Sequence, residues 1–187
     1  MNASWSEFFT AALAAADAGG VKRQRGGGRL ARAIDFGSND YLGLRDHPAV
    51  CSAMQTALVS AGWGSGASPV LNGYHPLHTA LERALAEHCR AVAAVVFSSG
   101  YACNLGSLAC LAESGDAIYS DELNHASLID GIRLSKADRI VYPHLAIEFL
   151  ENNLRKHRHF YRRVLIVSET IFSMDGDQAD LRALAQA

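Results

Sequence analysis

The chain has 187 residues, of which 49% are apolar and 19% are charged, a balance typical of a soluble globular α/β protein and not of a disordered chain. Seventeen basic and nineteen acidic residues give a formal net charge of −2, so no overall basic field points to nucleic acid as a partner. The sequence shows no apolar run of about 18 residues and no secretory-leader pattern. We therefore expect a protein that is neither secreted nor membrane-spanning. The four cysteines lack CxxC spacing, so a reducing, cytoplasmic setting is the default expectation.

Helices and short apolar strands are predicted to alternate along most of the chain. The first element is an Ala-rich amphipathic helix over 5–18, which Gly19 and Gly20 end. The further helices are expected at 48–61, 76–89, 101–113, 127–136, 146–157 and from 179 onward. The strands are expected at 31–36, 93–97, 117–119, 139–142 and 164–167.

Strands that alternate with helices in this way predict βαβ crossovers, and hence an α/β fold with a mainly parallel sheet and flanking helices. We divide the chain into an N-terminal helix and arm, residues 1–45, and the larger part of the fold, residues 46–187. The last predicted helix begins only a few residues before Ala187, and no strand follows it. The chain is therefore expected to be the front part of a longer protein.

The segment Ser98-Ser99-Gly100-Tyr101 joins a predicted strand to a predicted helix. Small residues at a helix N-terminus leave backbone N–H groups free to bind an anion such as a phosphate. In such sheets, ligands bind beyond the carboxyl ends of the strands. By itself the segment also fits an ordinary strand-to-helix turn.

Two further loops are predicted to reach the same edge of the sheet. His125 follows the strand at 117–119, and an imidazole there could stack on a flat cofactor or position a substrate carboxylate. Glu169 and Ser173 follow the strand at 164–167 and could orient a cofactor hydroxyl or a reactive loop. The segment Asp175-Gly176-Asp177 is interpreted as a tight turn, since it lacks the register of a calcium loop.

Other kinds of site have weaker support in the sequence. The glycine-rich loop at 62–69 follows a helix, so it lacks the context of a dinucleotide-binding loop; it is either a close-approach loop or an active-site wall. The histidine pairs at 75/78 and 157/159 lack a third ligand, and no metal site is expected. The basic run at 22–25 is either a solvated segment or a contact for an anion.

Five segments occur in a characteristic order: SNDYLGL at 38–44, GSGAS at 64–68 with NGY at 72–74, SGYAxN at 99–104, SDxxNHASLIDG at 120–131, and FSMDGD at 172–177. Together they resemble the α-oxoamine synthases, pyridoxal-phosphate (PLP) enzymes of the aspartate-aminotransferase fold (fold type I). The resemblance covers nearly the whole chain and implies that most of it is the N-terminal part of the PLP-binding large domain.

The resemblance also implies roles for individual residues. Gly100 and Tyr101 would hold the phosphate side of PLP, and His125 would stack on its pyridine ring. Ser173 would hydrogen-bond near the phenolic oxygen of the cofactor. Glu169 would support the site, and it and His125 are the residues expected to take part in catalysis.

For the substrates, the resemblance implies that Asn39 supports the amino-acid carboxylate and that Arg23 contacts the carboxylate of the acyl substrate. Arg25 is an alternative to Arg23, because the flanking residues match the family poorly. His144-Leu145-Ala146 departs from the usual motif and is interpreted as a tolerated surface change.

The family's Schiff-base lysine, and the aspartate that pairs with the pyridinium nitrogen, would both follow residue 187. The expected reaction of the complete protein is the decarboxylative condensation of L-alanine with a pimeloyl thioester in biotin synthesis, in a homodimer, with the present chain an inactive fragment. Glycine with acetyl-CoA, or another amino acid with a longer acyl thioester, is the alternative within the family. A non-catalytic binding fragment is the alternative outside it.

Overall fold

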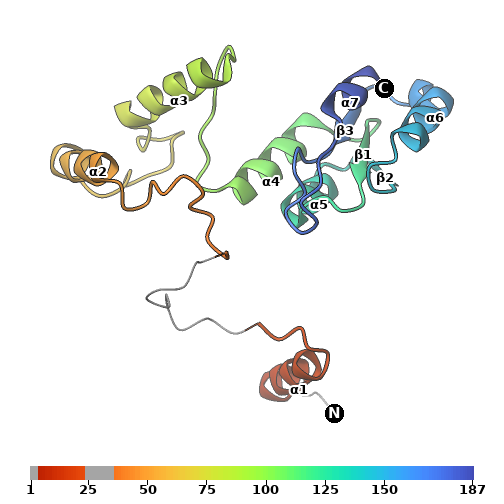
Figure 1. The fold of residues 1–187 in the computed structure, drawn as a ribbon, viewed down its shortest axis with the longest axis horizontal. Coiled ribbons are helices and arrows are strands. Elements are labelled where there is room, and N and C mark those ends of the chain that lie inside the picture. Colours follow the sequence, from red (N-terminus) through yellow and green to blue (C-terminus); the bar gives the residue numbers. More distant parts are fainter. Residues whose placement is uncertain (1–3, 24–35) are drawn as a thin grey trace. The chain divides into compact units, whose positions relative to one another are not determined.

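The computed structural model, drawn in Figure 1, describes residues 4–23 and 36–187. The chain divides into two compact units, Met1–Gly64 and Ser65–Ala187. The first unit contains helix α1 (Trp5–Ala18) and helix α2 (Pro48–Ala61). Both lie where the sequence predicts them. Of the strand predicted at 31–36 only Phe36 belongs to the described residues, and it lies in a turn.

Side chains at the helix starts explain where these two helices begin. The Ser4 hydroxyl accepts a hydrogen bond from the Glu7 N–H (3.2 Å), while Glu7 Oε2 accepts one from the Ser4 N–H (2.7 Å). This capping box satisfies N–H groups that an α-helix leaves unpaired. At the start of α2, His47 Nδ1 accepts the Ala49 N–H (3.3 Å), and Pro48 occupies the first turn, where its missing N–H costs nothing.

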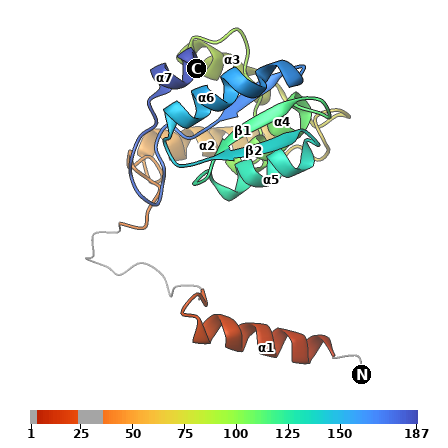
Figure 2. The same cartoon turned by 90° about the vertical axis from the view of Figure 1, so that its right-hand side faces the viewer.

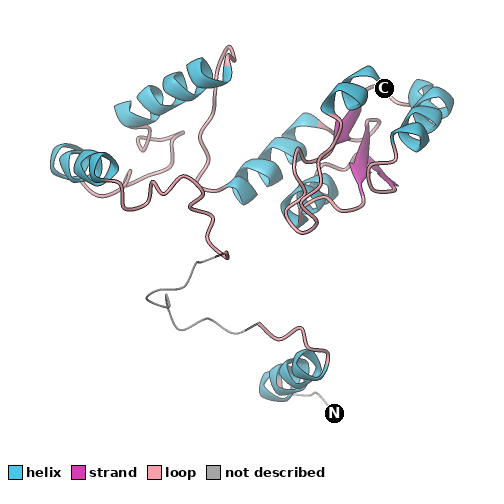
Figure 3. Ribbon diagram, viewed as in Figure 1, coloured by secondary structure: helices cyan, strands magenta, loops and turns pink. Residues whose placement is uncertain are grey.

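The second unit contains the parallel sheet and its helices (Figure 3). Its helices are α3 (Pro76–Cys89), α4 (Gly100–Leu111), α5 (Ala126–Leu134), α6 (Ile147–His157), the short 3₁₀ helix η1 (Arg158–Phe160) and α7 (Leu181–Gln186). Its strands are β1 (Ala117–Asp121), β2 (Asp138–Tyr142) and β3 (Val164–Val167).

The three strands pair in the order β2-β1-β3, and both pairings are parallel. Ala117 of β1 lies opposite Asp138 of β2 and Val164 of β3. The predicted α/β class with a mainly parallel sheet is confirmed. Because the strands run in the same direction, the loops that leave β1, β2 and β3 all emerge at the same edge.

Helices cover both faces of this sheet. On one face, Leu108 of α4 and Ile132 of α5 pack with Ile118 of β1 in a buried cluster. On the other face, Leu150 of α6 packs with Tyr119 of β1. Figure 2 shows β1 and β2 between α5 and α6. Every residue of β1 is buried, as expected of a central strand in a two-sided α/β sheet.

The strand predicted at 93–97 is not formed. This segment pairs with none of the three strands, and Val92 and Val95 are largely exposed. The Val96 N–H of this segment donates to Glu82 Oε1 of α3 (3.1 Å). An apolar segment forms a β-strand only when a neighbouring strand supplies the ladder hydrogen bonds. None of the described strands lies beside this segment, so it stays irregular.

An ion-pair network closes the edge of the sheet opposite the loops. Asp116, fully buried just before β1, accepts hydrogen bonds from Arg163 Nη2 (2.7 Å) and Arg162 Nε (3.1 Å). The two guanidinium groups, first that of Arg163, hold the pKa of the Asp116 carboxyl far below its ordinary value. The buried charge is thus paired, which fixes the entry of the chain into β3 beside β1.

Candidate cofactor-binding site

The N-terminus of α4 presents two backbone N–H groups without acceptors. Ser99 caps the helix, with its Oγ accepting the Ala102 N–H (3.1 Å) and its carbonyl accepting the Cys103 N–H (3.0 Å). In the described part of the chain, the N–H groups of Gly100 and Tyr101 have no such partner. A Cβ atom on Gly100 would meet nothing within 4 Å, so there is open space beside this residue. Free amides at a positive helix end suit a phosphate.

His125 is the N-cap residue of α5, and its side chain faces α4. The His125 imidazole and the Tyr101 ring meet edge to face, with centroids 6.4 Å apart. His125 Nδ1 accepts the Ser127 N–H (3.2 Å), so this nitrogen carries no proton. The Ser127 hydroxyl then donates to Nδ1 (2.7 Å), and its own oxygen accepts the Asn104 amide (2.9 Å).

This chain of hydrogen bonds assigns the tautomer of His125. With Nδ1 an acceptor twice over, the ring proton lies on Nε2. The free edge of the imidazole is therefore a donor. Asn104 from α4 and Ser127 from α5 together hold the ring in one orientation.

The loop after β3 reaches His125 from the neighbouring strand. Glu169 Oε1 accepts the backbone N–H of His125 at 2.5 Å, which joins two loops that lie 44 residues apart in sequence. Ser173 lies exposed farther along the same loop, and within the described residues its hydroxyl has no hydrogen-bond partner. The structure thus brings Tyr101, His125 and Glu169 into contact and leaves Ser173 on the same loop as Glu169.

Tyr101 is held from α5 as well. Its hydroxyl donates to Asp130, whose carboxylate also forms an ion pair with Arg133 (3.0 Å). The hydrogen bond to Asp130 raises the pKa of the Tyr101 phenol, and it lowers the pKa of the Asp130 carboxyl. The phenol therefore stays protonated at neutral pH, and its ring is fixed above the start of α4.

The two residues expected to contact substrates belong to the first unit. Asn39 is exposed, and its Oδ1 accepts a hydrogen bond from the Tyr41 hydroxyl (3.4 Å). Arg23 is exposed at the end of the described segment that follows α1. Arg25, the alternative to Arg23, lies outside the described residues.

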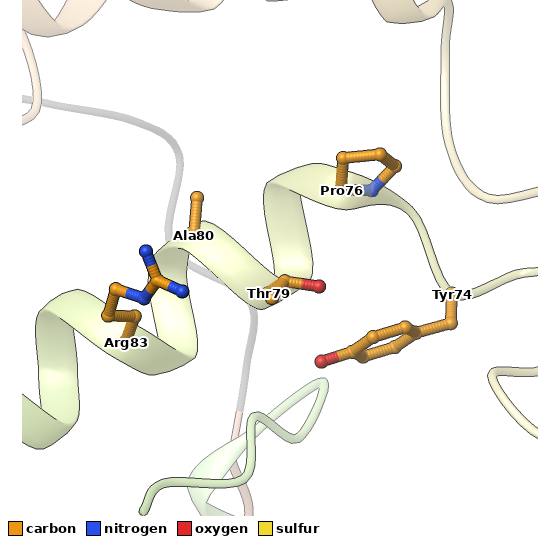
Figure 4. Close-up of a pocket in the computed structure, with 5 residues that line it drawn as sticks. All are labelled: Tyr74, Pro76, Thr79, Ala80 and Arg83. Carbon is orange, nitrogen blue, oxygen red and sulfur yellow. The ribbon is translucent and has the colours of Figure 1, made fainter.

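A separate shallow pocket lies on α3 and contains none of the predicted site residues. It is lined by Tyr74, Pro76, Thr79, Ala80 and Arg83 (Figure 4). The Tyr74 hydroxyl donates to Glu82 beside it. The backbone approaches itself closely just before α3, because a Cβ on Gly73 would lie 1.8 Å from the Ala67 carbonyl oxygen. Within the glycine-rich loop itself, Cβ atoms on Gly62, Gly64 and Gly66 would meet nothing within 4 Å.

A comparison with protein-family models matches residues 31–187 to the aminotransferase class I and II family. The chain belongs to this family. A curated relative from Aquifex aeolicus (strain VF5), which has a provisional form of the name 8-amino-7-oxononanoate synthase, is 53% identical over 152 residues. The alignment covers 81% of this chain and 41% of the relative, so the chain spans about two fifths of that protein's length.

Solved structures give the same aminotransferase class I and II fold. A serine palmitoyltransferase from S. paucimobilis with a bound PLP–myriocin aldimine is 27% identical, with a TM-score of 0.82 over 99% of this chain and 51% of that one. An 8-amino-7-oxononanoate synthase from Francisella tularensis is 30% identical, with a TM-score of 0.65 over 82% of this chain and 42% of that one. The predicted resemblance to the α-oxoamine synthases is confirmed.

Several side chains that organise the site in this family member were given no role from the sequence. Asn104 and Asp130 act through Ser127 and Tyr101, on the facing sides of α4 and α5. Asn104 lies one helical turn after Gly100, and this spacing was the available signal. The reading of His144 as part of a surface change is wrong, because its side chain is only 18% exposed and bonds two carboxylates.

Proposed function

We propose that the chain is the cofactor-binding part of an α-oxoamine synthase and that it holds PLP at the α4–α5 junction. The free N–H groups of Gly100 and Tyr101 would bind the phosphate, and the His125 imidazole would lie against the pyridine ring. The observation that carries the proposal is the placement of these free amides and the oriented His125 ring side by side. A dianionic phosphate on a flat aromatic ring matches both elements.

Bound PLP supplies the electron sink that lets an amino acid lose its carboxylate and form a carbon–carbon bond. The residues of this chain bind and orient. The amides of α4 would fix the phosphate end. His125, held by Ser127 and Asn104, would fix the ring plane and present Nε2–H as a donor. Glu169 would hold the His125 backbone, and Ser173 would approach the phenolic oxygen of the cofactor.

For the complete protein, we propose the condensation of L-alanine with a pimeloyl thioester to give 8-amino-7-oxononanoate, carbon dioxide and the free thiol carrier. The 53% identical relative and the similar synthase structure support this member of the family. Asn39 would bind the alanine carboxylate and Arg23 the pimeloyl carboxylate. We further propose a cytoplasmic homodimer; no described helix is both long and apolar enough to cross a membrane.

The lysine that such chemistry requires is proposed to come from another part of the protein. Lys136 lies two residues before β2 and Lys156 lies in the last turn of α6, both on the side of the sheet where strands begin, away from His125. Lys22 forms an ion pair with Asp17 in the first unit. The 187-residue chain by itself is therefore proposed to bind PLP weakly and not to turn over.

The proposed phosphate site at the N–H groups of Gly100 and Tyr101 is tested by introducing a negative charge there. Gly100→Asp is expected to weaken PLP binding by the chain about tenfold or more, because the new carboxylate repels the phosphate at the amides. The same substitution at Gly106, exposed two turns later in α4, is the control and should change binding less than about threefold. Fluorescence titration with PLP measures both. Equal weakening of PLP binding by the two variants would contradict a phosphate site at Gly100 and Tyr101.

The substrate assignment is tested with the complete protein. L-alanine with pimeloyl thioester, glycine with acetyl-CoA, and L-serine with palmitoyl-CoA are supplied in parallel, and the products are identified by mass spectrometry. We expect turnover with the first pair to exceed the others at least about a hundredfold in kcat/KM. A preference for glycine or serine would move the protein to another member of the family. Absence of turnover with all three pairs would favour the non-catalytic alternative.

A further inference from the structure

His144 lies in the loop after β2, between two carboxylates from different parts of the chain. Its Nδ1 is 2.8 Å from Asp121 Oδ1, at the end of β1, and its Nε2 is 2.8 Å from Asp177 Oδ2, in the loop after β3. The Asp121 side chain is fully buried, that of His144 is 18% exposed, and that of Asp177 is 38% exposed. One imidazole therefore joins the loops that leave all three strands.

The geometry favours a charged ring. A neutral imidazole has one N–H and one lone pair, so it can donate to only one of the two carboxylates. Both ring nitrogens lie at hydrogen-bond distance from a carboxylate oxygen, which an imidazolium satisfies by donating twice. These two carboxylates, first that of Asp121, raise the pKa of the imidazole above its ordinary value.

The surroundings of His144 reinforce this arrangement. Its backbone N–H donates to Glu122 Oε1 (2.8 Å), so every ionisable side chain that contacts it among the described residues is an acid: Asp121, Glu122 and Asp177. Leu145, the next residue, has a left-handed φ of 56° and donates its N–H to Asp121 Oδ2 (3.0 Å). A left-handed non-glycine residue is strained unless its surroundings hold it.

On the far side, His144 holds the loop that contains the candidate site residues. The ring packs edge to face on Phe172, with centroids 4.4 Å apart, and Phe172 is buried. The Phe172 N–H donates to the Asp177 carbonyl (3.0 Å), and the Gly176 N–H donates to the Phe172 carbonyl (2.8 Å). This confirms the predicted tight turn. Ser173 lies within it, so its position depends on where Phe172 and Asp177 are anchored.

We propose that His144 is a positioning residue: as an imidazolium bridging Asp121 and Asp177, it fastens the turn at 172–177, and with it Ser173, to the carboxyl edge of the sheet. That Ser173 is thereby positioned for PLP rests on the proposed function. That His144 fastens the turn at 172–177 does not depend on it. The fastening is pH-dependent. A histidine whose pKa is raised on folding stabilises the fold fully below its unfolded pKa, and the stabilisation is lost as the pH rises through its folded pKa.

The first test uses the wild-type chain without cofactor. Ring-nitrogen NMR of isotope-labelled protein should show both His144 nitrogens still protonated at a pH above about 6.5, the ordinary pKa of histidine. Amide hydrogen exchange, corrected for its intrinsic pH dependence, should show the Phe172 and Gly176 amides losing protection as His144 titrates. A His144 imidazole that loses its proton at or below that ordinary pKa overturns the proposal, and so does a turn whose amide protection stays constant while His144 titrates.

The second test compares His144→Gln with the matched control His88→Gln. His144→Gln should speed amide exchange at Phe172 and Gly176 roughly tenfold. It should also abolish the change in protection that accompanies the titration of His144 in the wild type, because glutamine has no charge to lose. His88→Gln should leave both properties as in the wild type. Circular dichroism checks that the helices persist. If PLP fails to bind wild-type protein that passes the first test, the proposed function fails and the fastening stands.

Discussion

Replacing Gly131 by valine is expected to lower the free energy of unfolding by about 3 kcal/mol. Gly131 lies in α5 where this helix crosses α4 with no space between the backbones. A Cβ at this position would lie 2.8 Å from the Asn104 carbonyl oxygen, 3.0 Å from Leu108 Cβ and 3.2 Å from Leu105 Cα. Two of these three atoms belong to backbone, so the helices must separate to admit a side chain. Separation also pulls Asn104 away from Ser127.

Gly131→Ala and Gly106→Ala separate this crowding from helix propensity. Alanine in a helix interior is favoured over glycine by about 1 kcal/mol, which Gly106→Ala should largely realise, because its nearest neighbour is the movable Phe97 ring at 3.3 Å. Gly131→Ala is expected to lower stability by about 1–2 kcal/mol despite that gain. Urea denaturation followed by circular dichroism measures all three variants. Stabilisation by both alanine substitutions would show that α4 and α5 pack less closely than described.

Replacing His125 by alanine in the complete protein is expected to lower kcat/KM about a hundredfold or more, because the variant would lose both the ring that we propose lies against the cofactor and the Nε2–H donor. Asn104→Leu should lower it about tenfold. In that variant the imidazole remains, but the Ser127 hydroxyl no longer receives the amide and is free to turn away from Nδ1. Both substitutions therefore act on the His125 imidazole: His125→Ala removes it, and Asn104→Leu only loosens its orientation.

The tautomer of His125 distinguishes a positioning role of Asn104 from a merely structural one. Once the Ser127 hydroxyl is released, the ring proton of His125 is held less firmly on Nε2, so ring-nitrogen NMR of Asn104→Leu should show a population with the proton on Nδ1. Asn152→Leu, on the exposed side of α6, is the matched control and should keep both the rate and the tautomer. An unchanged tautomer in Asn104→Leu, together with a lower stability, would assign Asn104 to packing alone.

Local signals in the sequence were sufficient for the helices and for most of the sheet. Ser4 with Glu7, and His47 with Pro48, mark helix starts that the structure reproduces, since caps act over three or four residues. Strands β1, β2 and β3 were predicted within two residues of their ends. The strand predicted at 93–97 is absent, because a β-strand needs a neighbouring strand to pair with, and composition does not show whether that neighbour exists.

The candidate site was predictable to the extent that it follows from topology. Parallel strands bring their following loops to one edge, so the approach of Glu169 to His125 was expected. What the sequence did not reveal is the supporting layer. The bridge through His144 depends on the rotamers of three side chains from three loops, and no spacing rule relates Asp121, His144 and Asp177. Such contacts are set by tertiary packing, after the local structure has formed.

The strand order has a consequence for how the chain emerges during synthesis. Central strand β1 is made before both of its neighbours, and its pairing with β2 needs only the chain up to Tyr142. Its other side remains unpaired until Val167 has been added, when the Val167 carbonyl also receives the buried Asn124 amide (2.8 Å). On the ribosome, α4 to β2 can therefore assemble early, while an open backbone edge waits for β3. Pausing of translation before residue 164 would prolong the exposure of that edge to other nascent chains.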